Sequence, residues 1–405
     1  MPSAERQSPG DIPASTATQI RPMKIAFVIS GLGVGGAEMM LWKLLSRINR
    51  THFEPIVVSL SSATDPMVPA YRQLGIRCEC LAWRPRTGAV TGFWRLLRTL
   101  GRLQPDIVQG WMYYGNLAAT VASACLQLRA PVLWNVRATL MEQRHEKRLT
   151  AAVIWLGGKL SFSPRRIINN SRASAVEHER RLGYRESKRL VLPNGFDTER
   201  FRPAPEARLA LRHFLGVPAG TPLIGMVARY HPMKDHRTFL QAAALVRKAR
   251  PQAHFVLVGQ HVEASNADLA SLIAECALSD SVHLLGPRDD IQSISAALDI
   301  QVSASSSGEG FPNVIGEAMS CGVPCVVTDV GDSADVVGES GVTVAPCDPR
   351  AMAAGVEQLL ALDLPQRAEL GRRARSRTIE EFSLDAVVRR YEELYLQVHH
   401  EKRST

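Results

Sequence analysis

The chain has 405 residues, too many for one ordinary domain and enough for two domains of roughly 200 residues each. Charged residues make up 21% and hydrophobic residues 45%, as in a soluble globular protein. Seven scattered cysteines without a C-x-x-C pair argue against a disulfide framework or a zinc site, and a reducing compartment fits best.

The net charge of +9 is unevenly distributed. Residues 21–190 contain 26 Lys and Arg against 10 Asp and Glu, whereas residues 191–405 have a net charge of −6. A strongly basic first half suggests an anionic partner, such as lipid headgroups, nucleic acid or an acidic acceptor. A solvated basic surface without a partner is the equally weighted alternative.

Residues 1–20 are rich in Ser, Pro, Ala and Thr and have no apolar core region, which predicts a disordered tail and not a signal peptide. The most apolar stretch, residues 151–158, is much shorter than the roughly 20 residues that a membrane span needs. We therefore expect a cytoplasmic protein that is either soluble or peripheral on the inner face of the membrane.

Short apolar runs alternate with amphipathic stretches in residues 21–190, the expected first domain. A parallel sheet covered by helices on both faces follows from this alternation. The expected strands are 24–30, 55–60, 76–81, 106–109, 132–135 and 166–169, and the expected helices are 38–48, 92–103, 116–128 and 173–182.

The alternation restarts after the turn sequence 193–197 and the Pro-rich connector 202–205. The expected second domain covers residues 191–380, with strands at 223–228, 253–258, 282–285, 299–303 and 323–327. A last helix at 384–398, within the segment 381–405, is expected to pack back onto the first domain. Ligands of such sheets bind beyond the carboxyl ends of the strands, so two facing domains predict a cleft.

The first strand is followed by the glycines Gly31, Gly33, Gly35 and Gly36 at the start of a helix. Gly31, Gly33 and Gly36 fit G-x-G-x-x-G, but no acidic residue ends the second strand, which argues against NAD. The remaining interpretation is close approach of backbone and helix N-terminus to an anionic ligand. A tight strand–helix turn without a ligand is the alternative.

Two further segments carry charges at expected strand ends. Arg229 and Lys234 follow the strand at 223–228, and two cations there suit a diphosphate; two solvated surface charges are the alternative.

Glu309 lies in a loop between glycines, and Glu317 lies on the helix that Pro312 can start. The free N-terminus of that helix offers N–H groups to phosphate. Two unrelated surface acids are the alternative reading.

In combination these motifs resemble glycosyltransferase family 4, retaining nucleotide-sugar glycosyltransferases of the GT-B fold. The GT-B fold consists of two Rossmann-like α/β domains that face each other across a cleft. The resemblance runs in chain order through residues 23–395: Gly35-Gly36-Ala37-Glu38, Pro193-Asn194-Gly195, Arg229 with Lys234, and Glu309 with Glu317. The combination is specific, whereas each single motif is weak.

The resemblance implies roles for individual residues. Arg229 and Lys234 would hold the donor diphosphate, Glu317 the ribose, and Glu309 would lie near the transferred sugar. The implied donor-binding residues are Gly35, Gly36, Arg288, Phe311, Asn313, Val314, Ile315 and Glu317.

Two residues depart from the family pattern. Arg137 stands where similar enzymes often carry a His, and with Tyr114 it is assigned to the acceptor side. Asp335 stands where the family usually has Glu, which shortens a polar contact.

The expected activity is transfer of a hexose from a UDP- or GDP-sugar to a lipid-linked saccharide or polysaccharide, as in lipopolysaccharide and other cell-surface glycan synthesis. No cofactor and no metal are expected, because the chain has no D-x-D and paired cations can serve the diphosphate. The alternative from another enzyme class is a nucleotide-sugar epimerase or hydrolase on the same scaffold. Nucleic acid is not an expected partner, because the chain has no basic stripe rich in aromatic residues.

The basic first half also predicts docking on an anionic membrane. In a helix at 92–103, Phe93, Leu96, Leu97 and Leu100 would share one face, while Arg95, Arg98 and Arg102 would lie toward another. Arg84 and Arg86 are expected to add to this surface. The alternative is that the apolar face packs on the sheet and the arginines are solvated.

Overall fold

The computed structural model describes residues 21–83, 88–140 and 148–403. The expected tail at residues 1–20, and Arg84 and Arg86, lie outside the described residues. Within the described part of the chain, no helix has the length and apolar character needed to cross a membrane.

The first half of the chain forms a parallel sheet with strand order β3-β2-β1-β4-β5-β6-β7. Its strands are β1 (Met23–Ile29), β2 (Phe53–Ser59), β3 (Arg77–Cys80), β4 (Ile107–Trp111), β5 (Val132–Val136), β6 (Arg166–Asn169) and β7 (Arg189–Val191). Its helices are α1 (Gly36–Arg47), α2 (Val68–Gln73), α3 (Ala89–Leu103), α4 (Met112–Cys125), α5 (Arg148–Leu160), α6 (Arg172–Leu182) and the short η2 (Glu186–Lys188).

The second half forms another parallel sheet, with strand order β10-β9-β8-β11-β12-β13. Its strands are β8 (Leu223–Val227), β9 (His254–Val258), β10 (Val282–Leu284), β11 (Ile300–Ser303), β12 (Cys325–Thr328) and β13 (Val342–Val344). Its helices are α7 (Pro205–Leu215), η3 (Pro232–Lys234), α8 (His236–Ala249), α9 (Ala267–Glu275), α10 (Ile291–Ala297), α11 (Asn313–Ser320), α12 (Ser333–Val337), η4 (Gly338–Ser340), α13 (Pro349–Ala361), α14 (Leu364–Arg377), η5 (Thr378–Phe382) and α15 (Leu384–Arg403).

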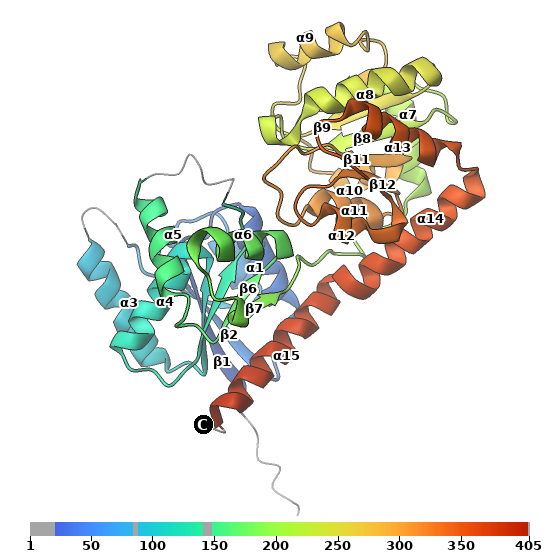
Figure 1. Cartoon of the computed structure of the whole chain (residues 1–405). Helices are drawn as coiled ribbons and strands as arrows, with labels where there is room; N and C mark the ends of the chain where they lie inside the picture. The colour runs from blue at the N-terminus through green and yellow to red at the C-terminus, as the bar shows by residue number, and fades with distance from the viewer. Residues whose placement is uncertain (1–20, 84–87, 141–147, 404–405) are drawn as a thin grey trace, which may run out of the picture.

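Helices cover both faces of each sheet, because the central strands are apolar on both sides. Strand β1, for example, buries Ile25 and Phe27 in one hydrophobic cluster and Ala26 and Val28 in another. The second sheet likewise separates two clusters. The expected α/β class with two Rossmann-like domains is confirmed (Figure 1). In both sheets the strand order reverses at the first strand, which places the crevice for ligands beside the ends of β1 and β8.

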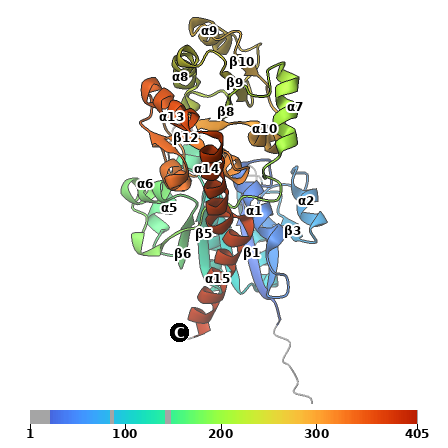
Figure 2. The ribbon, with the colours of Figure 1, turned by 90° about the vertical axis from the view of Figure 1, so that its right-hand side faces the viewer.

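The last helix, α15, runs from the second domain along the first (Figures 1 and 2). Val387, Tyr391, Tyr395 and Val398 are buried in the same cluster as β1 and α1. The Tyr395 hydroxyl donates to Gln109 Oε1 at 2.7 Å, at the centre of the first sheet. The first domain therefore includes a helix from the opposite end of the chain.

The chain passes between the domains twice, and the two passages lie side by side. The N–H of Phe196 donates to the carbonyl of Phe382, and the N–H of Leu384 donates to the carbonyl of Phe196, both at 2.8 Å. Gly195 is required at this crossing, since an added Cβ would lie 2.9 Å from the Leu384 Cα. The passages are thus joined by a short parallel pairing.

Candidate active site

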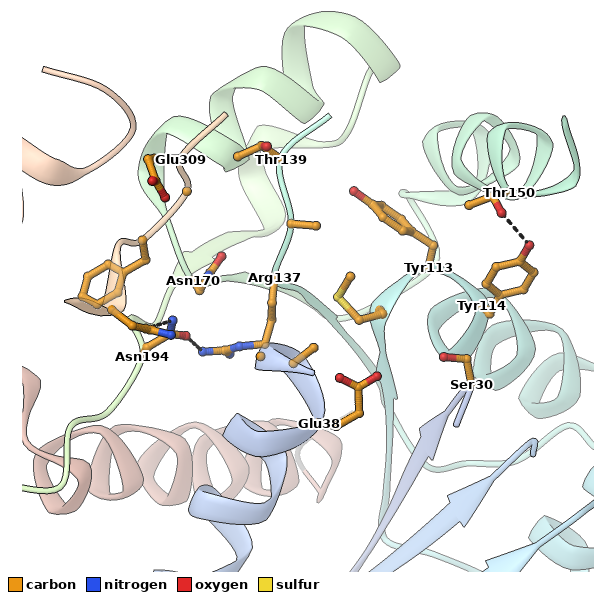
Figure 3. A pocket seen from close by; sticks show the side chains of 17 residues that line it. Ser30, Glu38, Tyr113, Tyr114, Arg137, Thr139, Thr150, Asn170, Asn194 and Glu309 are labelled. Carbon is orange, nitrogen blue, oxygen red and sulfur yellow. Dashed lines mark hydrogen bonds between the residues drawn. The ribbon is translucent and has the colours of Figure 1, made fainter. Parts of the chain in front are cut away.

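A cleft of about 480 Å³ lies between the carboxyl ends of the two sheets. Both domains contribute to its walls, and Figure 3 shows Glu309 across from Tyr113, Tyr114 and Glu38. The lining residues are Ser30, Gly36, Ala37, Glu38, Met112, Tyr113, Tyr114, Arg137, Ala138, Thr139, Thr150, Asn170, Asn194, Glu309, Gly310, Phe311 and Asn313.

Glu309 and Lys234 form an ion pair at the second-domain side of the cleft. Glu309 Oε1 accepts hydrogen bonds from Lys234 Nζ and, at 2.6 Å, from Ser305 Oγ. The Glu309 side chain is only 11% exposed, so its charge is held by these two donors. Gly308, which precedes Glu309, has a φ of +74° that favours glycine, and a Cβ there would displace the Met233 side chain.

Arg229 follows β8, five residues before Lys234, and is exposed. Burial, and then the nearby charges of Arg229 and Lys234, lower the pKa of His231. Lys234 ends η3 in the same segment, so both cations lie beyond the carboxyl end of β8. An anionic group that reaches this end of the strand meets two positive charges.

Arg137 is held in the cleft by groups from three parts of the chain. Its guanidinium donates to Tyr391 Oη of α15 at 3.0 Å. It also donates to Asn194 Oδ1 of the interdomain segment, as Figure 3 shows. The guanidinium carbon also lies 5.4 Å from the ring centroid of Trp111. Asn194 Nδ2 in turn donates to Asn313 Oδ1 of α11 at 2.7 Å. Arg137 is thus linked to the second domain through one amide side chain.

The glycine loop places the N-terminus of α1 at the cleft. Gly36 lines the cleft, whereas Gly35 is the N-cap immediately outside the lining. The Glu38 carboxylate folds back over the cap, since a Cβ on Gly35 would collide with Glu38 Oε2. The positive end of the helix therefore already faces a carboxylate.

The remaining residues expected to bind the donor lie at or near the start of α11, and only some of them line the cleft. Phe311 and Asn313 line the cleft, but Ile315 is fully buried in the core, and Val314 and Ile315 are absent from the lining. Burial raises the pKa of Glu317, while Lys43 of α1 and Arg200 oppose that rise. Glu317 is half-buried, and charges from both halves of the chain, Lys43 and Arg200, act on it.

Arg288 lies away from the cleft. Its guanidinium is exposed and binds Asp290 in the same loop, at 2.8 Å and 2.7 Å. Asp290 raises the pKa of Arg288 through this hydrogen bond. In this arrangement Arg288 is engaged by its own neighbour.

Tyr113, which was not among the residues expected in the site, reaches into the cleft from the start of α4 (Figure 3). Its hydroxyl lies 2.7 Å from His178 Nε2, and His178 Nδ1 lies 2.7 Å from the Ser174 carbonyl. A carbonyl only accepts, so Nδ1 carries the hydrogen; burial lowers the pKa of His178 and keeps the ring neutral. Tyr113 therefore donates to Nε2. Tyr113 could have been found from the sequence because it follows the end of an expected strand, where ligand-binding residues of such sheets lie.

Asn170 was also missed, although it follows β6 directly. It is 6% exposed and lines the cleft, and its Oδ1 has no hydrogen-bond partner among the described residues. Buried amide oxygens are normally satisfied, so this atom is available to a ligand hydroxyl.

The closed cleft is fastened by Asp332 of the second domain. Its carboxylate accepts hydrogen bonds from Ser171 Oγ and the N–H groups of Arg172 and Ala173, at 2.7–2.9 Å. These donors form the N-terminus of α6, which favours a negative charge. Burial raises the pKa of Asp332, and the three hydrogen bonds oppose that rise.

The described residues include no group of three or more His, Cys, Asp or Glu side chains that could hold a metal ion. Arg and Lys side chains and the helix N-termini described above are groups that can meet an anionic ligand in the cleft.

Two family sequence models match the chain. The model described as "Glycosyltransferase Family 4" matches residues 34–200, and the model described as "Glycosyl transferases group 1" matches residues 221–362. Together they cover both domains and reach both sides of the cleft.

Curated relatives match part of the chain. The D-inositol 3-phosphate glycosyltransferase of Corynebacterium urealyticum is 32% identical over 207 residues, which are 49% of this chain and 49% of that protein. The lipopolysaccharide core biosynthesis mannosyltransferase LpsB of Rhizobium meliloti is 27% identical over 224 residues, 53% of this chain and 63% of that protein. The chain therefore spans about half the length of the first of these relatives.

Among solved structures, HepE of Anabaena, crystallised in complex with UDP, superposes with a TM-score of 0.79. The superposition covers 93% of this chain and all of HepE, at 24% sequence identity. At this identity the likeness shows the shared two-domain fold.

Proposed function

The chain belongs to family 4 of the GT-B glycosyltransferases, and we propose that it transfers a sugar from a UDP- or GDP-sugar to a lipid-linked saccharide or polysaccharide, with retention of anomeric configuration. The observation that carries the proposal is the Lys234–Glu309 ion pair in the cleft, beside Arg229. A carboxylate and two cations in this place suit a ligand that has both sugar hydroxyls and phosphates.

The donor diphosphate binds Arg229 and Lys234. An incoming phosphate competes with Glu309 for the Lys234 ammonium, and the released Glu309 carboxylate then accepts hydrogen bonds from the sugar hydroxyls. The N-terminus of α11 adds N–H donors on the same side of the cleft. Binding of the donor phosphate therefore releases the Glu309 carboxylate from Lys234 and makes it available to the sugar.

Further donor contacts follow from the positions of three residues. Glu317 lies between the domains and accepts the ribose hydroxyls, and Phe311 and Asn313 border the sugar. Arg288 reaches the base only when it leaves Asp290, so we assign it the weakest part in donor binding. Gly36 lets the first domain approach the donor from the opposite wall.

Sugar transfer passes through an oxocarbenium-like centre while the diphosphate leaves. The required stabilisation of the leaving phosphates comes from Arg229, Lys234 and the start of α11, so we propose that transfer is independent of metal. Water must be kept from the reacting centre, and the Asp332 contacts that close the cleft serve this purpose.

The acceptor enters from the first domain, past Arg137 and Tyr114. LpsB, the relative named for lipopolysaccharide core biosynthesis, supports an acceptor in cell-surface glycan synthesis. The net charge of +16 in residues 21–190 supports a peripheral position on an anionic cytoplasmic membrane surface. Sedimentation with liposomes of rising anionic lipid content tests this position. Protein that stays in the supernatant at low salt argues against it, and Arg98→Ser should reduce any pelleting.

Thermal stabilisation by a panel of nucleoside diphosphates and nucleotide-sugars tests donor binding, because a ligand of the native state raises the melting temperature. Stabilisation by one base series, together with its sugar donors, is the expected result. No stabilisation by any member at millimolar concentration would contradict the proposal.

Product analysis then separates transfer from the alternative epimerase or hydrolase activity. The stabilising donor is incubated with and without a membrane-lipid extract. Sugar recovered in the lipid fraction supports transfer. Release of free sugar or of an epimer at the same rate without the extract supports the alternative.

A further inference from the structure

A second cavity, the apolar groove, adjoins the cleft on the first domain. It has a volume of about 510 Å³ and lies between α3, α4 and α5. Its lining residues are Ser30, Leu60, Ser61, Trp83, Ala89, Phe93, Tyr114, Leu117, Ala118, Val121, Leu149 and Val153. Hydrocarbon side chains dominate this set, and it contains no charged residue.

The groove and the cleft meet at two residues. Ser30 and Tyr114 line both cavities. The Tyr114 hydroxyl lies 3.0 Å from Thr150 Oγ1, which connects α4 to α5 at the junction (Figure 3). A polar group in the cleft and an apolar group in the groove could therefore belong to one molecule that passes Tyr114.

The outer surface of the same three helices carries several exposed apolar side chains. Exposed hydrophobic side chains lie on each helix: Val90, Trp94, Val121, Leu149, Trp155 and Leu156. Trp94 and Trp155 are 66% and 60% exposed, which is unusual for such large apolar side chains. An exposed apolar surface beside an apolar groove is typical of a site that binds a membrane or a lipid.

The charges on these helices are all positive. Helices α3, α4 and α5 contain Arg95, Arg98, Arg102, Arg148 and Lys159 and no Asp or Glu. Lys159 lies over the ring of Trp155, with its Nζ 5.7 Å from the ring centroid. Cations among exposed Trp and Leu side chains complement anionic headgroups above hydrocarbon.

We propose that the apolar groove binds the hydrocarbon chain of a lipid acceptor while the polar head of that lipid occupies the cleft. This inference rests on the proposed glycosyltransferase function and specifies its acceptor as a lipid. The continuity of groove and cleft at Tyr114 selects a molecule with both parts, and the surrounding cations select one with an anionic headgroup or a position in an anionic bilayer. Two residues of the apolar face of α3 that was expected to dock on the membrane belong to the core instead, because Leu96 and Leu100 are fully buried against the sheet.

Binding of n-alkyl β-D-glucosides of four to eight carbons to the full chain, below their micellar concentrations, tests the groove. Affinity measured by isothermal titration calorimetry should rise about three- to fourfold with each methylene, as expected for transfer of a methylene from water. An affinity that does not depend on chain length would overturn the proposal.

Two variants locate the binding. Val121→Trp fills the groove from α4, and Leu149→Ser makes its α5 wall polar; both side chains are exposed at the surface, so the fold should tolerate the changes. Leu156→Ser is the matched control, an exposed Leu on the same helix that does not line the groove. We expect octyl glucoside affinity to fall at least tenfold in both groove variants and to stay within twofold in the control. Equal affinity in all four proteins would overturn the proposal.

Nucleoside-diphosphate binding, measured on the same samples, separates this inference from the proposed function. Unchanged nucleotide affinity in every variant, with alkyl binding lost only in the groove variants, supports the groove as the chain site. Nucleotide binding without any alkyl binding would leave the glycosyltransferase proposal standing and refute the lipid groove.

Discussion

Ser171 donates its hydroxyl hydrogen to Asp332 across the domain boundary, at 2.9 Å. The contact depends on Gly331, whose φ of +64° lets the loop after β12 lie against the backbone of Glu309 and Gly310. Asp332 also donates its own N–H to the Gly310 carbonyl at 3.0 Å. One loop therefore supports the Glu309 segment and fastens the two domains.

Asp332→Ala should open the cleft, because three donors at the start of α6 lose their acceptor. A hydrogen bond to a charged group is typically worth about 1.5–3 kcal/mol. We expect a larger radius of gyration in solution scattering and weaker protection of the cleft from proteolysis. Asp335→Ala, an exposed acid one turn away, is the control. Superimposable scattering curves for wild type and Asp332→Ala would show that other contacts hold the closed state.

Glu309→Ala should nearly abolish transfer while the melting temperature stays near that of wild type. The loop position of Glu309 makes a minor contribution to the core, but its carboxylate is the acid held at the cleft by Lys234 and Ser305. Because the variant frees Lys234, nucleoside-diphosphate affinity should not fall. Turnover within a few-fold of wild type would remove Glu309 from the catalytic residues.

Arg229→Ala and Lys234→Ala should each weaken nucleoside-diphosphate binding. The loss of one charged hydrogen bond corresponds to an affinity lower by about 10- to 150-fold. The nucleoside without phosphates should bind both variants as it binds wild type, because neither cation is assigned to the base or the ribose. Calorimetric titration of both ligands gives the comparison, and diphosphate affinity unchanged in both variants would refute the assignment.

Transfer should persist in excess EDTA. The cations Arg229 and Lys234 act on one edge of the second sheet, and they can neutralise a diphosphate without an ion. The measurement is initial rate against EDTA concentration after dialysis. Complete loss that magnesium or manganese restores would instead demonstrate a metal site.

Burial lowers the pKa of His236 to about 4, with Lys234 acting in the same direction and Asp235 against it. Between about pH 4 and the ordinary value of 6.5, the unfolded chain binds a proton that the folded chain does not bind. The free energy of unfolding should therefore fall as pH falls through this window, by at most about 3 kcal/mol from this residue. Urea unfolding of wild type and His236→Gln between pH 4 and 7 measures the difference. A difference that does not vary with pH would contradict the shift.

The sequence predicted the central parts of the fold well, since long buried strands such as β1 and β9 are continuous apolar runs. The three-residue edge strands β7 and β13 were not predicted, whereas β10, an edge strand of the same length, was. Helix α5 was recognised only as an apolar stretch. Its periodicity is weak, because its outer face also carries Trp155 and Leu156.

Candidate-site residues could be located from the sequence where a charged side chain follows the end of a strand. Contacts that depend on the facing domain could not be predicted in the same way. Glu309 and Lys234 do meet, although 75 residues separate them. The links of Arg137 to Asn194 and Tyr391 could not be predicted, because they require the position of the second domain and of α15. Arg288 was expected to bind the donor, but its guanidinium instead donates to Asp290 in the same loop.

The paired passages at Phe196 and Phe382 leave the two domains one main degree of freedom. The two hydrogen bonds between the passages hold the domains together at this point. They still permit a hinge rotation of one domain relative to the other about an axis through it. Asn194 lies next to this axis, so the Arg137–Asn194–Asn313 link should persist through opening. The hydrogen bonds between Asp332 and the N-terminus of α6 join the domains away from the two passages, and they must break when the domains rotate apart. Opening of the cleft would then require loss of the Asp332 contacts, while the contacts beside the two passages stay intact.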